Sequence, residues 1–209
     1  MLVFANNCFS GFLYKQLNAE FNHPLFWGSF YLDNHPEFYY HFIKEFYNIN
    51  FTNYKIETEK DEYTINQFKE WHKDTFYPVY SFEGWKYRFS HYKYDANADI
   101  PLRKDMDIKY KHIFNYANEK FQKRLSKFPK NETPVFIVHF NDNKPADNEI
   151  VKKFCMLKNR KLIIVCRHKE NYETAQKYKN DQLLVLTHPS GEQIPDICIR
   201  HLETIKAFI

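Results

Sequence analysis

The fold is decided by residues 135–166, which read VFIVHFNDNKPADNEIVKKFCMLKNRKLIIVC. The segment begins and ends with short aliphatic runs, Val135 to Phe140 and Leu162 to Cys166, which are typical of buried strands. Between them, Asn148 to Leu157 has the apolar spacing of a helix. A strand, a helix and a second strand in this order predict a parallel crossover, so we expect a layered α/β protein.

The same alternation continues to the end of the sequence. We predict a helix at Tyr172 to Tyr178, a strand at Leu183 to Leu186 and a helix at Asp196 to Phe208. Near the beginning, Leu2 to Ala5 is a further short apolar run. The predicted fold class is therefore α/β, a layered α-β-α sandwich whose C-terminal half consists of parallel β-α-β units. The length and the lack of a linker predict a single domain over residues 1–209.

The middle of the chain is rich in aromatic residues. Phe76 to Phe82 and Trp85 to Tyr92, joined by Glu83-Gly84, predict a β-hairpin. Alternation along the second arm places His91 on the same face as the aromatic residues Trp85, Tyr87 and Phe89.

Three further helices are predicted from apolar spacing. One begins at Cys8, one covers Pro36 to Tyr47, and a long one covers Asp107 to Phe128. The polar stretch from Phe51 to Thr64 gives no clear pattern.

Composition excludes several classes of protein. A net charge of +4 lacks the concentrated basic surface of nucleic-acid binders, so no nucleic-acid partner is expected. No run of apolar residues is long enough to span a bilayer, and no signal peptide is recognisable, so we expect a cytoplasmic protein without a transmembrane segment. The four glycines are far apart, which excludes the glycine-rich loops that bind dinucleotides and nucleoside triphosphates. No G-x-S-x-G motif of serine hydrolases is present.

The strongest indication of chemistry is Cys8, where the first strand gives way to a helix. The free amides and the positive dipole end of a helix start favour an anion, so a thiol there can become a thiolate nucleophile. Such a nucleophile usually needs an imidazole base, and His91 is the candidate. The other cysteines, Cys155, Cys166 and Cys198, lie in or beside apolar segments and are interpreted as core residues.

No metal site is expected. Asp105-Met106-Asp107 has the carboxylate spacing with which sugar-nucleotide transferases hold a metal ion, but no buried strand precedes it. We interpret these carboxylates as capping the long helix, and a metal-dependent glycosyltransferase is kept as an alternative. His35 and His41 are poorly spaced for a shared metal ion.

The motif residues resemble two related groups of bacterial proteins. One is the exopolysaccharide-biosynthesis family called domain of unknown function 1919, which the chain resembles at Asn6-Asn7-Cys8, Gly11, Tyr14, Asn22 to Pro24, Ser90-His91-Tyr92 and Phe140-Asn141-Asp142. The other is a papain-like cysteine peptidase family with a Pro-Phe-Asp-Trp-like box. Pro24 to Trp27 echoes this box, with Phe26 in place of the aspartate.

The resemblance implies a papain-like Cys/His site near the N-terminal helix and the central hairpin. In it, Cys8 is the nucleophile, His91 is the base, and Asn141 or Asp142 is an orienting group. Because such proteins are encoded among capsule and exopolysaccharide genes, and a relative is thought to use coenzyme A, we expect an O-acyltransferase. It would move an acyl group, expected to be acetyl, from a coenzyme A thioester to a bacterial surface polysaccharide or its precursor.

In this mechanism the Cys8 amide and either a neighbouring amide or Asn7 stabilise the oxyanion. An alternative is that His91 acts directly on the acceptor, without a covalent intermediate. Two groups of side chains are candidates for substrate binding: Trp27 and Trp85 on sugar faces, and Lys15, Arg88, Arg103 and Lys104 on donor phosphates.

Besides the glycosyltransferase, two alternatives stay open. The same dyad could hydrolyse a peptide or amide, as papain-like hydrolases do. The protein could also be a non-catalytic module of a polysaccharide assembly complex.

Overall fold

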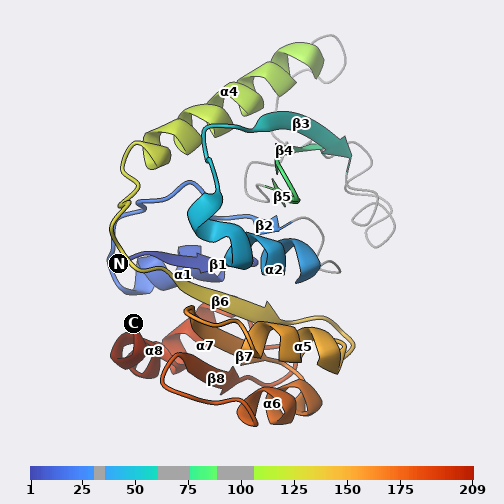
Figure 1. The fold of residues 1–209 in the computed structure, drawn as a ribbon. Helices are drawn as coiled ribbons and strands as arrows, with labels where there is room; N and C mark the ends of the chain where they lie inside the picture. Colours follow the sequence, from blue (N-terminus) through green and yellow to red (C-terminus); the bar gives the residue numbers. More distant parts are fainter. Residues whose placement is uncertain (31–35, 61–75, 89–105) are drawn as a thin grey trace.

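A computed structural model describes residues 1–30, 36–60, 76–88 and 106–209. Its central feature is a parallel sheet in the strand order β1-β6-β7-β8 (Figure 1). The strands are β1 (Val3–Ala5), β6 (Val135–Phe140), β7 (Lys161–Cys166) and β8 (Leu183–Thr187). The predicted α/β class with parallel β-α-β units is confirmed.

Helices cover both faces of the parallel sheet. One face packs against α1 (Phe9–Gln16), α7 (Ile194–Arg200) and α8 (Leu202–Phe208). The other packs against α2 (Pro36–Glu45), α5 (Asn148–Cys155) and α6 (Lys169–Gln176). Successive strand residues alternate between the two faces, which explains why each strand is apolar at nearly every position.

Two helix predictions need correction. The helix predicted at Asp196 to Phe208 is in fact two helices, α7 and α8, which meet at His201, where the backbone departs from helical geometry (φ −102°, ψ 8°). Helix α6 begins at Lys169, three residues before the predicted start, because charged residues in its first turn hide the beginning of the apolar pattern. In the described part of the chain, no helix has the length and apolarity needed to cross a membrane.

A second, antiparallel sheet lies on the α2 side of the parallel sheet (Figure 1). Its strand order is β2 (Ser29–Phe30), β5 (Trp85–Arg88), β4 (Phe76–Phe82) and β3 (Lys55–Lys60). The predicted hairpin is confirmed as β4 and β5, and its turn uses Gly84 at a φ of +80°. The end of its predicted second arm, Phe89 to Tyr92, lies outside the described residues. Strand β3 occupies a stretch that the sequence left unassigned, and a short 3₁₀ helix (Phe46–Asn48) precedes it.

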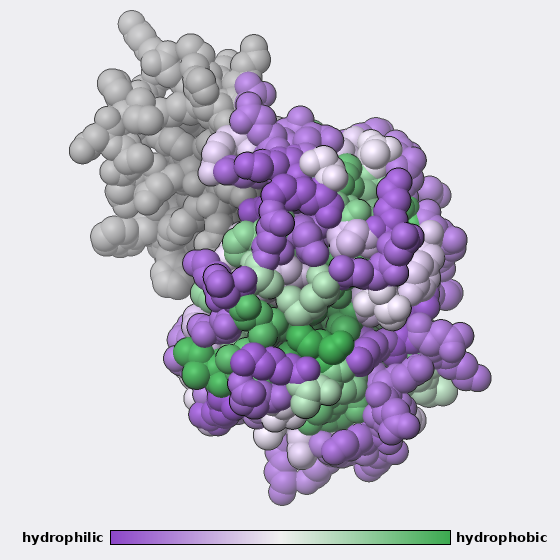
Figure 2. All heavy atoms as spheres, turned by 90° about the vertical axis from the view of Figure 1, so that its left-hand side faces the viewer, coloured by the Kyte–Doolittle hydropathy of each residue, from purple (hydrophilic) through white to green (hydrophobic). Residues whose placement is uncertain are grey.

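Aromatic side chains fill the space between the two sheets. The ring of Phe42 in α2 contacts Phe4 of β1, Phe30 of β2 and Trp85 of β5, with centroids 4.7–5.3 Å apart. The long helix α4 (Met106–Leu125) packs Phe121 on this cluster. Figure 2 shows the face that carries both chain termini, where hydrophobic residues form a band across an otherwise hydrophilic surface.

The two sheets meet at the end of β1. The backbone amide of Phe30 in β2 donates a hydrogen bond of 3.0 Å to the carbonyl oxygen of Asn6, the residue after β1. This contact brings β2 and β5 beside the carboxyl edge of the parallel sheet. Ligands of α/β proteins commonly bind at that edge.

Candidate functional site

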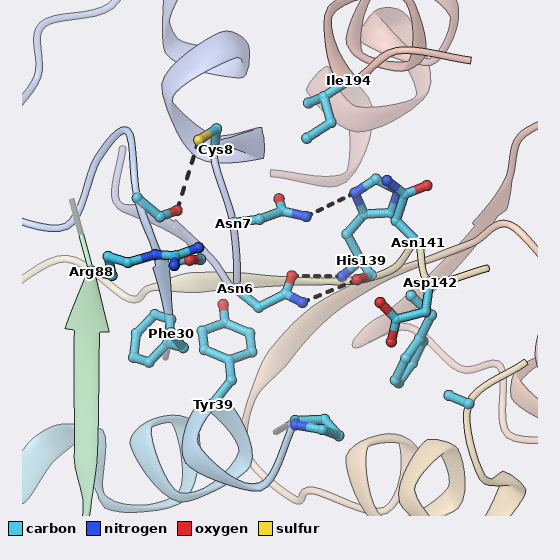
Figure 3. Close-up of a pocket in the computed structure, with 15 residues that line it drawn as sticks. Asn6, Asn7, Cys8, Phe30, Tyr39, Arg88, His139, Asn141, Asp142 and Ile194 are labelled. Carbon is cyan, nitrogen blue, oxygen red and sulfur yellow. Dashed lines mark hydrogen bonds between the residues drawn. The ribbon is translucent and has the colours of Figure 1, made fainter. Parts of the chain in front are cut away.

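A pocket of about 260 Å³ lies at the carboxyl ends of β1 and β6, where the two sheets meet (Figure 3). Its wall comes from the segment after β1, the start of β2, helix α2, the end of β5 and the segment after β6. The lining side chains that matter most for the chemistry are Asn7, Cys8, Tyr39, Arg88, His139 and Asp142.

The pocket brings together part of the site that the sequence predicts. Asn7, Cys8, Arg88, Asn141 and Asp142 all line it, although they come from three separate stretches of the chain. Parallel strands β1 and β6 end at the same edge of the sheet, which explains why the segments that follow them meet.

Three other predicted residues, Lys15, Trp27 and Trp85, do not line the pocket. Lys15 and Trp27 contact each other, with the Lys15 Nζ 4.7 Å from the indole centroid. Trp85 is only 2% exposed and stacks on Phe82 in the aromatic core. The predicted residues His91, Arg103 and Lys104 lie outside the described residues.

Cys8 differs from the other cysteines in its surroundings. It is half-buried and occupies the N-cap position of α1 without a capping side-chain hydrogen bond, and its Sγ lies 3.9 Å from the carbonyl oxygen of Gly28. Burial raises the pKa of Cys155 to about 11 and the pKa values of Cys166 and Cys198 to about 12, so these thiols stay protonated. All four cysteines are described, and Cys8 is the one that is not buried.

Asn6 extends the pairing of β1 with β6 through its side chain. Its Oδ1 accepts a hydrogen bond of 2.8 Å from the backbone amide of His139, and its Nδ2 donates one of 3.0 Å to the carbonyl oxygen of His139. The side-chain carboxamide therefore makes the two hydrogen bonds that the backbone of one further paired residue would make (Figure 3). It allows the main chain to turn toward Cys8 while staying attached to β6.

One histidine of the lining, His139, was not predicted from the sequence, and it is hydrogen-bonded to a second histidine, His188. The His139 Nδ1 lies 3.0 Å from Nδ2 of Asn7, its Nε2 lies 3.0 Å from Nε2 of His188, and the His188 Nδ1 lies 2.9 Å from the carbonyl oxygen of Pro189. Both imidazoles are only 3% exposed.

These contacts form a chain of hydrogen bonds from Asn7 through His139 and His188 to Pro189. The groups at its two ends fix the direction of each hydrogen bond in it. The Pro189 carbonyl can only accept, so His188 carries its proton on Nδ1 and accepts at Nε2 from His139. At the other end, the Phe9 amide donates to Asn7 Oδ1, which turns the Asn7 Nδ2 toward His139. Both ends require a neutral His139 with its proton on Nε2.

The chain of hydrogen bonds gives His139 a positioning role. Burial, together with the neighbouring His188, lowers the pKa of His139 to about 3, so the ring stays neutral. Its Nδ1 lone pair is engaged by Asn7, and no nitrogen is left to take a proton from Cys8. His139 therefore holds the Asn7 side chain in place. The only signal in the sequence was a polar residue inside the apolar run of β6.

No protein-family model matches the chain, and the comparison with curated proteins finds no match. The family resemblance stays a prediction that rests on the motif residues. Some of the described motif residues line the pocket: Asn6, Asn7, Cys8, Asn141 and Asp142. Others, Tyr14, Asn22 and His23, form hydrogen bonds along the outer edge of β1.

At that edge, side chains satisfy backbone groups that no neighbouring strand reaches. The Tyr14 hydroxyl accepts a hydrogen bond of 3.2 Å from the Val3 amide and lies 3.0 Å from both the Met1 carbonyl and Asn22 Oδ1. The His23 Nε2 donates to the Val3 carbonyl over 2.7 Å. Burial holds the pKa of His23 well below its usual value, so it stays neutral. These contacts fix the strand that leads to Cys8.

Arg167 organises the loop that carries Asn141 and Asp142. Its Nη1 donates to the Asn141 carbonyl over 3.2 Å and to Asn143 Oδ1 over 3.0 Å, and its Nη2 donates to Ser190 Oγ over 2.8 Å. The guanidinium thus joins the loops after β6 and β8 and keeps Asp142 at the rim of the pocket.

In residues 1–30, 36–60, 76–88 and 106–209, no three His, Cys, Asp or Glu side chains gather as metal ligands would. Asp107 lies in the first turn of α4, and Asp105 lies outside the described residues.

Proposed function

We propose that the protein is an acyltransferase whose nucleophile is the thiol of Cys8. The observation that carries the proposal is the position of this thiol: it belongs to the N-cap residue of α1, it is not buried, and it lines the pocket at the carboxyl edge of the parallel sheet. The three buried cysteines, with their raised pKa values, have no such access.

The reaction has two steps. The Cys8 thiolate attacks the carbonyl carbon of a thioester, a new C–S bond forms, and the donor thiolate leaves and takes up a proton. An acceptor hydroxyl then attacks the acyl-Cys8 carbonyl, loses its proton to a base, and releases the Cys8 thiolate.

The start of α1 supplies groups that suit the oxyanion of both steps. The Phe9 amide is engaged by Asn7 Oδ1, but the amides of Ser10 and Gly11 follow in the first turn, and the Asn7 Nδ2 has a second hydrogen besides the one given to His139. Because His139 is fully engaged, we retain His91 as the proposed base. Arg88 lines the same pocket and is the proposed contact for donor phosphates.

The identity of donor and acceptor rests on the family resemblance. We propose a coenzyme A thioester as donor and a hydroxyl of a surface polysaccharide or its precursor as acceptor, in the cytoplasm. Association with a polysaccharide assembly complex belongs to the same proposal.

Intact-mass measurement after incubation with acetyl-coenzyme A tests the first step. We expect one acetyl adduct on the wild-type protein and on Cys155→Ala, and none on Cys8→Ala. An adduct that survives in Cys8→Ala would overturn the assignment of the nucleophile.

Alkylation by iodoacetamide tests the activation of the thiol. The folded protein should take up one equivalent of iodoacetamide, at Cys8. An ordinary thiol reacts slowly below its pKa of about 8.5, whereas the reaction of Cys8 should stay fast well below pH 8. His91→Ala should return the pH profile to that of an ordinary thiol. Identical profiles for the two proteins would exclude His91 as the base.

The alternatives predict different results in the same assays. A hydrolase would cleave peptide amides and would not transfer the acetyl group to a sugar. A glycosyltransferase would bind a nucleotide sugar in the presence of manganese and lose that binding in Asp107→Ala.

A further inference from the structure

Two buried hydroxyl groups in the wall of the pocket have no hydrogen-bond partner among the described residues. They are the Oη of Tyr39 and the Oγ of Ser29, in residues that are 1% and 5% exposed. In Figure 3 the Tyr39 hydroxyl points from α2 into the pocket, toward Asn6. A buried hydroxyl without a partner is destabilising, so a ligand that supplies a partner gains free energy on binding.

Tyr39 contrasts with Tyr14, which is equally buried. The Tyr14 hydroxyl has three protein groups within 3.2 Å, whereas the proton of the Tyr39 hydroxyl has no acceptor in the described part of the protein. Burial raises the pKa of Tyr39 well above its usual value, an effect that the nearby Ile137 amide partly opposes although it does not meet hydrogen-bond geometry with the hydroxyl. The group is therefore a neutral hydrogen-bond donor, and it faces the pocket.

The charges of the groups that line the pocket balance. Arg88 and Asp142 both line it and carry opposite charges, and His139 is neutral. The lining as a whole therefore carries no net charge that would select against an uncharged ligand. The rings of Phe30 and Phe140 add an apolar wall beside these polar groups, and a lining of both kinds is found in small-molecule sites.

We propose that Tyr39 and Ser29 form a sugar-binding subsite, in which their hydroxyls bind hydroxyl or ring oxygen atoms of one sugar residue. A sugar is uncharged, carries many hydrogen-bonding oxygens and presents apolar C–H faces to aromatic rings. The assignment of this sugar as the acyl acceptor rests on the proposed function, whereas the binding itself does not.

The test is the binding of glucose, galactose and N-acetylglucosamine to the full-length protein, measured by ligand-observed NMR. Tyr39→Phe removes only the hydroxyl and should weaken binding of the sugar that binds best by about tenfold or more. Its melting temperature should stay the same or rise, because the lost hydroxyl had no partner. Ser29→Ala should behave in the same way.

Tyr14→Phe is the matched control. It removes a buried hydroxyl that does have partners, so the melting temperature should fall while sugar affinity stays unchanged. Equal affinity of Tyr39→Phe and the wild type, or no binding of any of the three sugars, would overturn the subsite. A drop in melting temperature for Tyr39→Phe as large as for Tyr14→Phe would also overturn it.

The subsite and the proposed function can fail separately. Acetylation of Cys8 without any sugar binding would remove the subsite and leave the thiol chemistry. Sugar binding that depends on Tyr39, with no acetylation of Cys8, would remove the thiol chemistry and leave the subsite.

Discussion

Asn7 and His139 lie 132 positions apart in the sequence, and a hydrogen bond of 3.0 Å joins the Nδ2 of one to the Nδ1 of the other. The bond connects the turn before Cys8 to the end of β6, and His188 continues it to the end of β8. Asn6, the preceding residue, binds the backbone of the same histidine. The position of the proposed nucleophile therefore depends on three strands.

Replacing His188 with Ala should destabilise the fold. The Nε2 proton of His139 loses its acceptor in a buried place, so the free energy of unfolding should fall by about 1–3 kcal/mol in urea denaturation. His188→Gln should recover part of the loss, because its Oε1 can accept. His201→Ala, which removes an exposed hydrogen bond to the Thr187 carbonyl, should cost about 1 kcal/mol or less. Equal stability of His188→Ala and the wild type would contradict the inferred chain of hydrogen bonds.

Stability should decrease as the pH falls below about 6.5. The pKa values of His23 and His139 are lowered in the folded state, that of His139 to about 3. Below the ordinary histidine pKa of about 6.5, and above these lowered values, only the unfolded protein takes up protons on the two side chains. Each histidine adds up to about 1.4 kcal/mol per pH unit to the slope. Urea denaturation from about pH 7 to pH 5 measures it. The variant His23→Gln should have a shallower slope, and a flat profile for the wild type would show that these histidines are protonated in the folded protein.

The parallel sheet could be predicted from the sequence because its strands are buried on both faces. Strands such as Leu162 to Cys166 are continuous aliphatic runs, and the crossover rule then fixes their direction. Strands β2 and β3 were missed for opposite reasons. Strand β2 has two residues, too few to show a period, and β3 is the polar segment Lys55–Lys60, paired along one side only with β4.

The site could be predicted only where one segment carries its own signal. Cys8 follows a strand and begins a helix, and Asn141-Asp142 follows another strand. His139 gave no such signal, since its hydrogen bonds go to residues 132 and 49 positions away. Tyr39 reads as one aromatic among many in α2, and only the tertiary structure shows that its hydroxyl faces a pocket.

Gly28 should tolerate no side chain. A Cβ there would lie 2.1 Å from the Arg88 carbonyl oxygen and 2.7 Å from the Tyr87 ring, so Gly28→Ala should cost about 3 kcal/mol or more. Gly191→Ala is the matched control, because its Cβ would meet nothing within 4 Å and only the φ of +85° adds strain, about 1–2 kcal/mol. Thermal unfolding of both variants measures the difference. Similar losses for the two would mean that β5 can move away from Gly28.

Asn6→Asp should be strongly destabilising although it changes a single atom. The new oxygen replaces Nδ2 and faces the His139 carbonyl at about the 3.0 Å of the present hydrogen bond, so a donor is lost and two acceptors repel each other. We expect a loss of about 3 kcal/mol in the free energy of unfolding at pH 7, measured in urea. The exposed Asn131→Asp makes the same change in charge and should cost less than about 0.5 kcal/mol. If both variants lose equally little, the Asn6 carboxamide does not hold β1 to β6, and the position of Cys8 must depend on the contacts of Asn7 alone.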